Sequence, residues 1–232
     1  MAEWLRGAAE AFERAFINGD RWKLYLDGLG LTIRISLFAA ILGLLIGTVL
    51  AFMKLSVAGG RKTPWNLVAN IYIDVIRGTP AVLQLLIMYF IVFAFSRNGI
   101  MIAILTFGIN SGAYVAEIVR AGILAVDKGQ TEAGRAMGLG KAQTFIHVVM
   151  PQAAKNILPP MGNEFIVLLK ETAIVGYVGL SDLTRIANQI ASRTYEPFMP
   201  LIGAAIIYFT IIKVLTVLLG KLERRLRAGD AR

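Results

Sequence analysis

The sequence predicts an all-α protein, a polytopic membrane helix bundle with five transmembrane helices. Hydrophobic residues make up 56% of the 232 positions and charged residues 17%, whereas an ordinary soluble domain is about 45–50% apolar and about 25% charged. The mean hydropathy is +0.65. Most of the 24 Lys and Arg and 15 Asp and Glu residues lie in short segments between long apolar runs. This pattern is typical of a chain that crosses a bilayer several times.

Residues 1–28 are expected to form an extracytoplasmic amphipathic N-terminus. Apolar side chains recur every four residues, at Trp4, Ala8, Phe12 and Phe16, which is typical of a helix that lies against a membrane surface. The first twenty residues contain several charges and lack the apolar core of a cleaved signal peptide.

A helix needs about 20 mostly apolar residues to cross about 30 Å of hydrocarbon. Residues 65–95 hold two pieces that are each too short to cross alone, so we expect one long helix that leaves the bilayer at its polar end. The whole chain, 1–232, is then a single transmembrane domain. Its spans are predicted at about residues 31–53, 79–96, 100–120, 161–180 and 200–220.

Basic residues are distributed unevenly between the two sides of the predicted bundle. Segments 54–64, 120–160 and 221–232 together hold 13 Lys and Arg against four Asp and Glu, whereas the segments on the other side hold seven of each. Loops rich in Lys and Arg stay in the cytoplasm. We therefore expect the N-terminus outside and the basic tail, 221–232, in the cytoplasm.

Several chemistries lack the residues they need. The chain has no Cys, which excludes disulfides and thiolate metal sites, and its one His, His147, cannot form a zinc site alone. A phosphate-binding G-x-x-x-x-G-K-[ST] loop is also missing. We expect no catalytic residue, no metal site and no cofactor bound by this chain. Membrane orientation explains the basic loops better than nucleic-acid binding does.

The longest polar segment, residues 127–159, is predicted to be cytoplasmic and to contain two short helices at a glycine corner. They are expected at Gln130–Met137 and Ala142–Val149, separated by Gly138 and Gly140 and ended by Pro151. Together they would form a compact projection, the knob (residues 127–151). The knob is interpreted as a docking surface for a soluble partner or, alternatively, as an ordinary solvated loop.

The knob resembles a known signature. Glu132-Ala133, then Gly138, then Val148-x-Met150-Pro151 is similar to the EAA loop of ABC-importer permeases, with Gly134 in place of the third alanine. A glycine there costs up to about 1 kcal/mol of helix stability relative to alanine.

The likeness covers roughly residues 20–227 and narrows the class. The chain looks like the polar amino-acid uptake permeases, which import histidine, arginine, glutamine, glutamate or opines. The matching motifs are Arg77-Gly78-Thr79-Pro80 with Gln84, Ala113-Tyr114-x-x-Glu117-x-x-Arg120, Lys128-Gly129-Gln130, Asn163-Glu164-Phe165 and Lys170-Glu171-Thr172.

The resemblance implies a five-helix type I importer permease in the prokaryotic inner membrane, a transport subunit and not an enzyme. It would pair with a second permease, identical or related, and each copy would present its knob as a coupling helix to one subunit of an ATPase dimer. ATP and Mg²⁺ would bind that ATPase, and an extracytoplasmic solute-binding protein would deliver a polar amino acid. The coupling residues would be Glu132, Ala133, Gly134, Arg135, Gly138 and Pro151.

Ionisable groups at membrane depth cost about 2.5–3.5 kcal/mol each on insertion scales, so each needs an explanation. Lys170 and Glu171, in the middle of the fourth span, either line a polar pathway or form a core ion pair. Pro80 either bends a substrate path or merely kinks a helix, and Asn110-Ser111-Gly112 either makes polar contacts or lets helices pack closely. For Glu117 a structural salt bridge to Arg120 is favoured. The candidate pathway residues are Arg77, Thr79, Pro80, Asn110, Glu117, Lys170, Glu171 and Thr172.

Two other classes of membrane protein are alternatives to an importer permease. A secondary transporter or channel for small polar solutes, driven by an ion gradient, would show inverted repeats with paired broken helices, and five spans cannot divide evenly. An intramembrane enzyme is the other option, but the H-E-x-x-H motif is missing and the one histidine, His147, lies outside the predicted spans.

Overall fold

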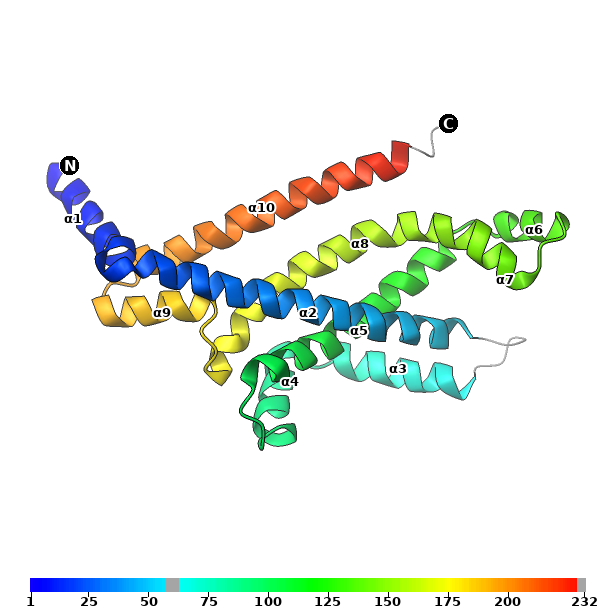
Figure 1. Cartoon of the computed structure of the whole chain (residues 1–232), viewed down its shortest axis with the longest axis horizontal. Helices are drawn as coiled ribbons and strands as arrows, with labels where there is room; N and C mark the ends of the chain where they lie inside the picture. Colours follow the sequence, from blue (N-terminus) through cyan, green and yellow to red (C-terminus); the bar gives the residue numbers. More distant parts are fainter. Residues whose placement is uncertain (57–62, 229–232) are drawn as a thin grey trace.

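The computed structural model describes residues 1–56 and 63–228, and every regular element in these residues is helical (Figure 1). The side chain of Trp4, the basic residues Arg61 and Lys62, and the end of the tail at 229–232 lie outside the described part. The helices are α1 (Ala2–Phe12), α2 (Arg21–Leu55), α3 (Pro64–Arg77), α4 (Ala81–Ile87), α5 (Gly99–Leu124), α6 (Lys128–Ala136), α7 (Lys141–Thr144), α8 (Met150–Glu171), α9 (Leu183–Thr194) and α10 (Phe198–Ala228).

Shorter helical turns connect several of these helices. They are η1 (Glu13–Ile17), η2 (Asn18–Asp20), η3 (Met88–Val92), η4 (Phe145–Val149) and η5 (Thr172–Val178). Three helical stretches of the described residues are long and apolar enough to cross a membrane: Arg6–Leu55, Gly99–Leu124 and Phe198–Leu226. The bent pair of α3 and Ala81–Val92 adds a fourth if it is one broken span. The number of five spans stays a prediction.

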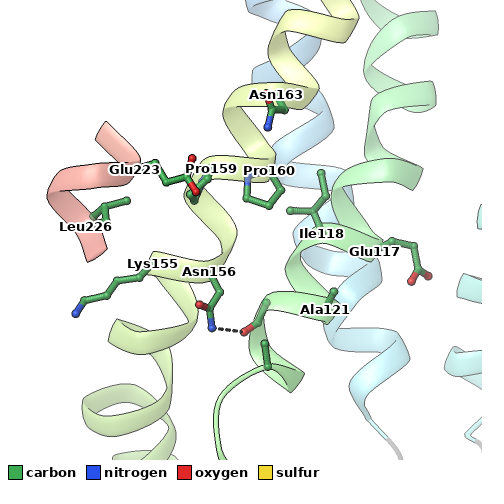
Figure 2. Close-up of a pocket in the computed structure, with 12 residues that line it drawn as sticks. Glu117, Ile118, Ala121, Lys155, Asn156, Pro159, Pro160, Asn163, Glu223 and Leu226 are labelled. Carbon is green, nitrogen blue, oxygen red and sulfur yellow. Dashed lines mark hydrogen bonds between the residues drawn. The ribbon is translucent and has the colours of Figure 1, made fainter. Parts of the chain in front are cut away.

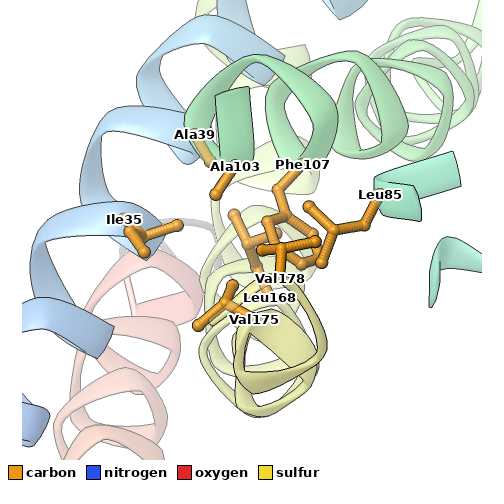
Figure 3. Packing of buried hydrophobic residues seen from close by; sticks show 8 residues of the cluster. All are labelled: Ile35, Ala39, Leu85, Ala103, Phe107, Leu168, Val175 and Val178. Atoms are coloured by element: carbon orange, nitrogen blue, oxygen red, sulfur yellow. The ribbon is translucent and has the colours of Figure 1, made fainter. Parts of the chain in front are cut away.

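Helices α2 and α5 form the centre of the molecule because small residues let them approach closely. A Cβ atom on Gly47 would lie 2.5 Å from Val115, so a side chain larger than hydrogen has no room at this crossing. Around them an apolar cluster collects side chains from α2, α4, α5, α8 and η5 (Figure 3). Its buried members are Ile35, Ala39, Leu85, Ala103, Phe107, Leu168, Val175 and Val178.

The single long helix expected over residues 65–95 is wrong. The chain breaks between α3 and α4, and the helix axes on the two sides differ by 101°. Pro80 has no N–H to donate and disfavours the helical conformation at Thr79. Gln84 stabilises the break, because its Nε2 donates to the carbonyl of Ile76 at 2.8 Å and to that of Thr79 at 3.1 Å.

The expected end of the second knob helix at Pro151 is also wrong. Residues 141–144 form α7, the π-helical turn η4 follows, and the backbone continues directly into α8 at Met150. Pro151 lies in the first turn of α8, where a missing N–H is tolerated. Helix α8 therefore starts eleven residues before the predicted fourth span and ends at Glu171, and η5 completes the segment.

Helix α9 begins at a buried carboxylate. Asp182 accepts hydrogen bonds from the amides of Thr184 at 2.9 Å and Arg185 at 3.2 Å. Burial raises the pKa of the Asp182 carboxyl, and the same hydrogen bonds oppose that shift. The apolar face of α9 packs beside Tyr25 of α2 through Leu183, Ile186, Ala187 and Ile190. This contact fixes α9 at the end of the molecule that also holds the N-terminus (Figure 1).

The knob lies at the opposite end, near the ends of α2 and α10 and the start of α3 (Figure 1). The ends of α2 and α10, the start of α3 and the knob, which belong to three segments predicted to share one side of the membrane, thus lie at one end of the molecule (Figure 1).

Candidate functional site

The knob is built by helix caps at both ends of α6. Asp127 caps the start, since its Oδ1 accepts from the Gly129 amide at 2.8 Å. At the other end Gly138 has φ +87°, a left-handed conformation that glycine adopts without strain. The amide of Leu139 donates to Gly134 O at 3.1 Å and that of Gly138 to Arg135 O at 3.0 Å. These two bonds form a Schellman motif, so the predicted glycine corner is present.

The knob presents a mostly exposed surface. Glu132, Ala133, Arg135 and Gly138 are exposed, and the corner residue Met137 is 85% exposed. Pro151 is exposed at the start of α8. Gly134 differs from the other candidate coupling residues because it is buried inside the knob, against Thr144.

Four of the candidate pathway residues lie at or near the break between α3 and α4. Gln84 Nε2 donates to Thr79 Oγ1 at 2.7 Å, and the buried Asn110 of α5 donates from Nδ2 to Gln84 Oε1 at 3.0 Å. The Arg77 guanidinium lies 5.1 Å from the centre of the Tyr114 ring, a cation–π contact. Polar groups of three helices, α3, α4 and α5, therefore meet beside the break that Pro80 creates.

A second polar group joins α5 to α8. Ser111 Oγ donates to Glu164 Oε1 at 2.9 Å, and Glu164 is close enough to Arg77 and Glu171 to interact with both electrostatically. Thr172 is buried, and its Oγ1 lies 3.2 Å from Ser36 Oγ of α2. The two polar groups involve consecutive residues of α5, Asn110 and Ser111.

Lys170 and Glu171 point in different directions. Lys170 is exposed and Glu171 is half-buried, and in the part of the chain that the structure describes no ion pair joins them. The core ion pair that was one interpretation is thus not formed. Lys170 follows Asn163 by seven residues on α8, and both are exposed.

Glu117 belongs to an ion cluster and not to the two polar groups. One carboxylate oxygen pairs with Lys54 of α2, and the other accepts from Arg120 at 2.8 Å. This cluster ties α2 to α5 through Lys54, and it contains the favoured salt bridge between Glu117 and Arg120 of the same helix. A cavity of about 860 Å³ lies between α5, α8 and α10, and the Glu117 carboxylate points away from it (Figure 2). Asn156, Asn163 and the Pro159–Pro160 pair line its α8 side.

Sequence reasoning did not select Gln84, Glu164 and Lys54 as site residues, and it considered Ser111 only as a possible polar contact beside Asn110. Glu164 carries the same signal as Lys170 and Glu171, an ionisable group within the fourth predicted span, and that signal was sufficient to find it. Gln84 follows a proline break that frees backbone carbonyls, which need donors. Lys54 gives no local signal, because its partner Glu117 is distant in the sequence. Among the described residues no three His, Asp or Glu gather closely enough to hold a metal ion.

Comparison with known proteins gives consistent matches over most of the chain. Residues 43–228 match the family model described as binding-protein-dependent transport system inner membrane component. The arginine transport system permease protein ArtQ of Bacillus subtilis is 42% identical over 208 residues, which cover 88% of this chain and 93% of ArtQ. The glutamine transport system permease protein GlnP of Escherichia coli K12 is 37% identical over 209 residues, 88% of this chain and 93% of GlnP.

Solved structures agree with these sequence matches. A chain from a crystal structure of an amino acid ABC transporter with histidines superposes with a TM-score of 0.81 at 46% identity, covering 88% of this chain and 94% of that one. A chain of the methionine transporter MetNI in an inward-facing conformation gives a TM-score of 0.77 at 18% identity, over 88% and 97% of the two chains. The second likeness shows the fold alone.

Proposed function

The chain belongs to the family of binding-protein-dependent transport system inner membrane components, and on that premise we propose that it lines the path of an ABC importer for polar amino acids. It is a permease subunit, a transport component and not an enzyme. A second permease, identical or related, would complete the path. The relatives named for arginine and glutamine transport support the substrate class.

One observation carries the proposal: charged and polar groups from α3, α4, α5 and α8, some buried and some exposed, are grouped together in a mainly apolar bundle. Charges at membrane depth are costly unless they face one another or water. An amino acid carries an ammonium and a carboxylate. Glu164 and Glu171 would attract the ammonium, and Arg77 or Lys170 would attract the carboxylate. With two carboxylates in the group, a substrate with an additional cationic side chain is favoured.

The knob supports another part of the proposal, that this permease is coupled to a separate ATPase subunit. Its exposed charges, Glu132 and Arg135, would contact an ATPase subunit that binds ATP and Mg²⁺ itself. The knob and the C-terminus would lie in the cytoplasm, as the excess of basic residues predicts. The end with the N-terminus and α9 would then face outward, where an extracytoplasmic solute-binding protein would deliver substrate.

Reconstitution tests this function. The permease is purified with its ATPase and inserted into liposomes. The binding protein is included in the same assay, and each of the twenty amino acids is offered in turn. We expect ATP hydrolysis that is stimulated by a small set of polar amino acids. Purification without any ATPase, together with uptake driven by an ion gradient, would contradict the proposal and support a secondary transporter.

A further inference from the structure

Gly134 is buried although its neighbours on α6 are exposed, and the residue that covers it is Thr144 of α7. A Cβ atom on Gly134 would lie 2.7 Å from the Thr144 Cγ2 methyl and 3.3 Å from its Oγ1. Contacts of Cβ atoms below 3.0 Å essentially never occur in proteins. Glycine is therefore required for α6 to approach α7 as closely as it does.

Thr144 is held in one orientation by its own helix. Its Oγ1 donates to Gly140 O at 3.0 Å, and the side chain is 1% exposed. A threonine has few accessible χ1 rotamers, and this hydrogen bond selects one of them. The hydroxyl is thereby occupied, and the Cγ2 methyl is the group that contacts α6.

The contact connects the knob surface to the helix that carries the candidate pathway residues. From Lys141 the helical backbone runs through η4 into α8 without a break, since Phe145 and Met150 both have right-handed helical dihedral angles. The run to Glu171 is roughly 45 Å long at 1.5 Å per residue. A cleft of about 510 Å³ between the knob and the inner end of α5 lies beside the contact and is lined by Leu124 and Thr144 among others.

We propose that Thr144 is a positioning residue for coupling: its methyl, seated on Gly134, fixes α6 against the α7–α8 run and transmits displacements of α6 to α8. The inference rests on the proposed function. In the EAA signature, which the knob resembles, the residue at the position of Gly134 is an alanine, whose side chain is a methyl group. In this chain the Thr144 side chain supplies the methyl group instead, so Gly134 and Thr144 act together.

Variants that move the methyl group from Thr144 to the position of Gly134 test this proposal. Thr144→Ser removes the methyl and keeps the hydroxyl, Gly134→Ala adds a methyl that collides, and the double variant exchanges one methyl for the other. The measurement is the number of substrate molecules transported per ATP hydrolysed by the reconstituted complex, with labelled arginine, glutamine or histidine. We expect each single variant to lower this ratio at least about threefold, and the double variant to recover most of the loss.

Matched controls are Gly30→Ala, at a helical glycine with no atom within 4 Å of its Cβ, and Thr48→Ser, at a threonine with the same bond to the carbonyl four residues earlier. Both should leave the ratio unchanged. Unchanged ratios in the single variants, or additive losses in the double variant, would overturn the inference. If a single variant loses its ATPase on purification, the double variant must regain it. A wild-type chain without ATP-driven transport would refute the proposed function instead.

Discussion

Single polar side chains stabilise the places where the helices of this chain are interrupted. Gln84 donates to two carbonyls that the break at Pro80 leaves open and accepts from Asn110 of the neighbouring helix. The Gln84 side-chain amide thus supplies hydrogen bonds to the two open backbone carbonyls and fixes the distance between α4 and α5. Glu164 has a comparable position between α5 and α8, where it accepts from Ser111 and lies near Arg77.

Replacing Gln84 by leucine should destabilise the protein by about 1–3 kcal/mol, because the buried Asn110 side chain and the part-buried Ile76 carbonyl lose their partner. The measurement is reversible unfolding of the purified protein in detergent micelles. Gln189→Leu, on α9 and away from the break, is the matched control. Equal stability of the two variants would show that the break does not depend on Gln84.

Glu164→Gln and Glu171→Gln should each weaken substrate affinity by about tenfold, which corresponds to about 1.4 kcal/mol. The amide keeps the shape of the side chain and removes the charge that would attract an ammonium group. Substrate dependence of ATP hydrolysis in proteoliposomes gives the affinity, and Glu10→Gln at the exposed N-terminal segment is the control. Unchanged affinity and unchanged substrate choice in both variants would remove these carboxylates from the pathway.

Helix interruptions and helix crossings in this chain depend on particular residue types. Hydropathy found the apolar centres of α2, α5 and α10, because a long apolar run is a local property of the sequence. It did not find the start of α8 at Met150 or the uninterrupted run from α7, since a proline is read as a stop unless the preceding turn is known to be helical. At Pro80 only a bend or kink within one long helix was expected, whereas two helices meet there at 101°, an angle that depends on how α4 packs on α5.

Gly47→Ala should lower the stability by about 1–3 kcal/mol, because its Cβ would lie 2.5 Å from Val115 at the crossing of α2 and α5. Gly30→Ala on the same helix meets no atom within 4 Å and should be neutral or stabilising. Unfolding of both variants under identical conditions gives the comparison. A stable Gly47→Ala variant would mean that α2 and α5 are farther apart than described.

Charge reversal or a bulky side chain in the knob should uncouple transport while the protein remains in the membrane. Glu132→Lys reverses an exposed charge, and Gly138→Asp places a side chain at φ +87°, where glycine is favoured. Membrane fractionation and substrate uptake are measured together, with Arg97→Glu as a charge-reversal control away from the knob. Normal uptake in both knob variants would show that the knob is not the docking surface.

The two ends of the molecule carry different groups of residues, and α8 connects them. The knob, at one end, joins α8 through α7 (Figure 1), and α8 carries Glu164, Lys170 and Glu171. Much of this arrangement of the knob and α8 could be predicted from the charge distribution and the EAA-like spacing, because both can be read directly from the sequence. The packing of Thr144 on Gly134 and the pairing of Lys54 with Glu117 could not, since each depends on a contact between helices that folding alone brings together.

Labelling of a single cysteine in the knob tests the central claim most directly. The chain has no Cys, so Met137→Cys creates a unique thiol at a position that is 85% exposed. Tyr195→Cys, at a 95% exposed residue near the other end, is the control. A maleimide that cannot cross membranes should label Met137→Cys from the cytoplasmic side of membrane vesicles, and bound ATPase should block the reaction, whereas Tyr195→Cys should react from outside and be unaffected. Labelling of Met137→Cys from outside, or equal labelling with and without ATPase, would contradict the assignment of the knob as the coupling surface.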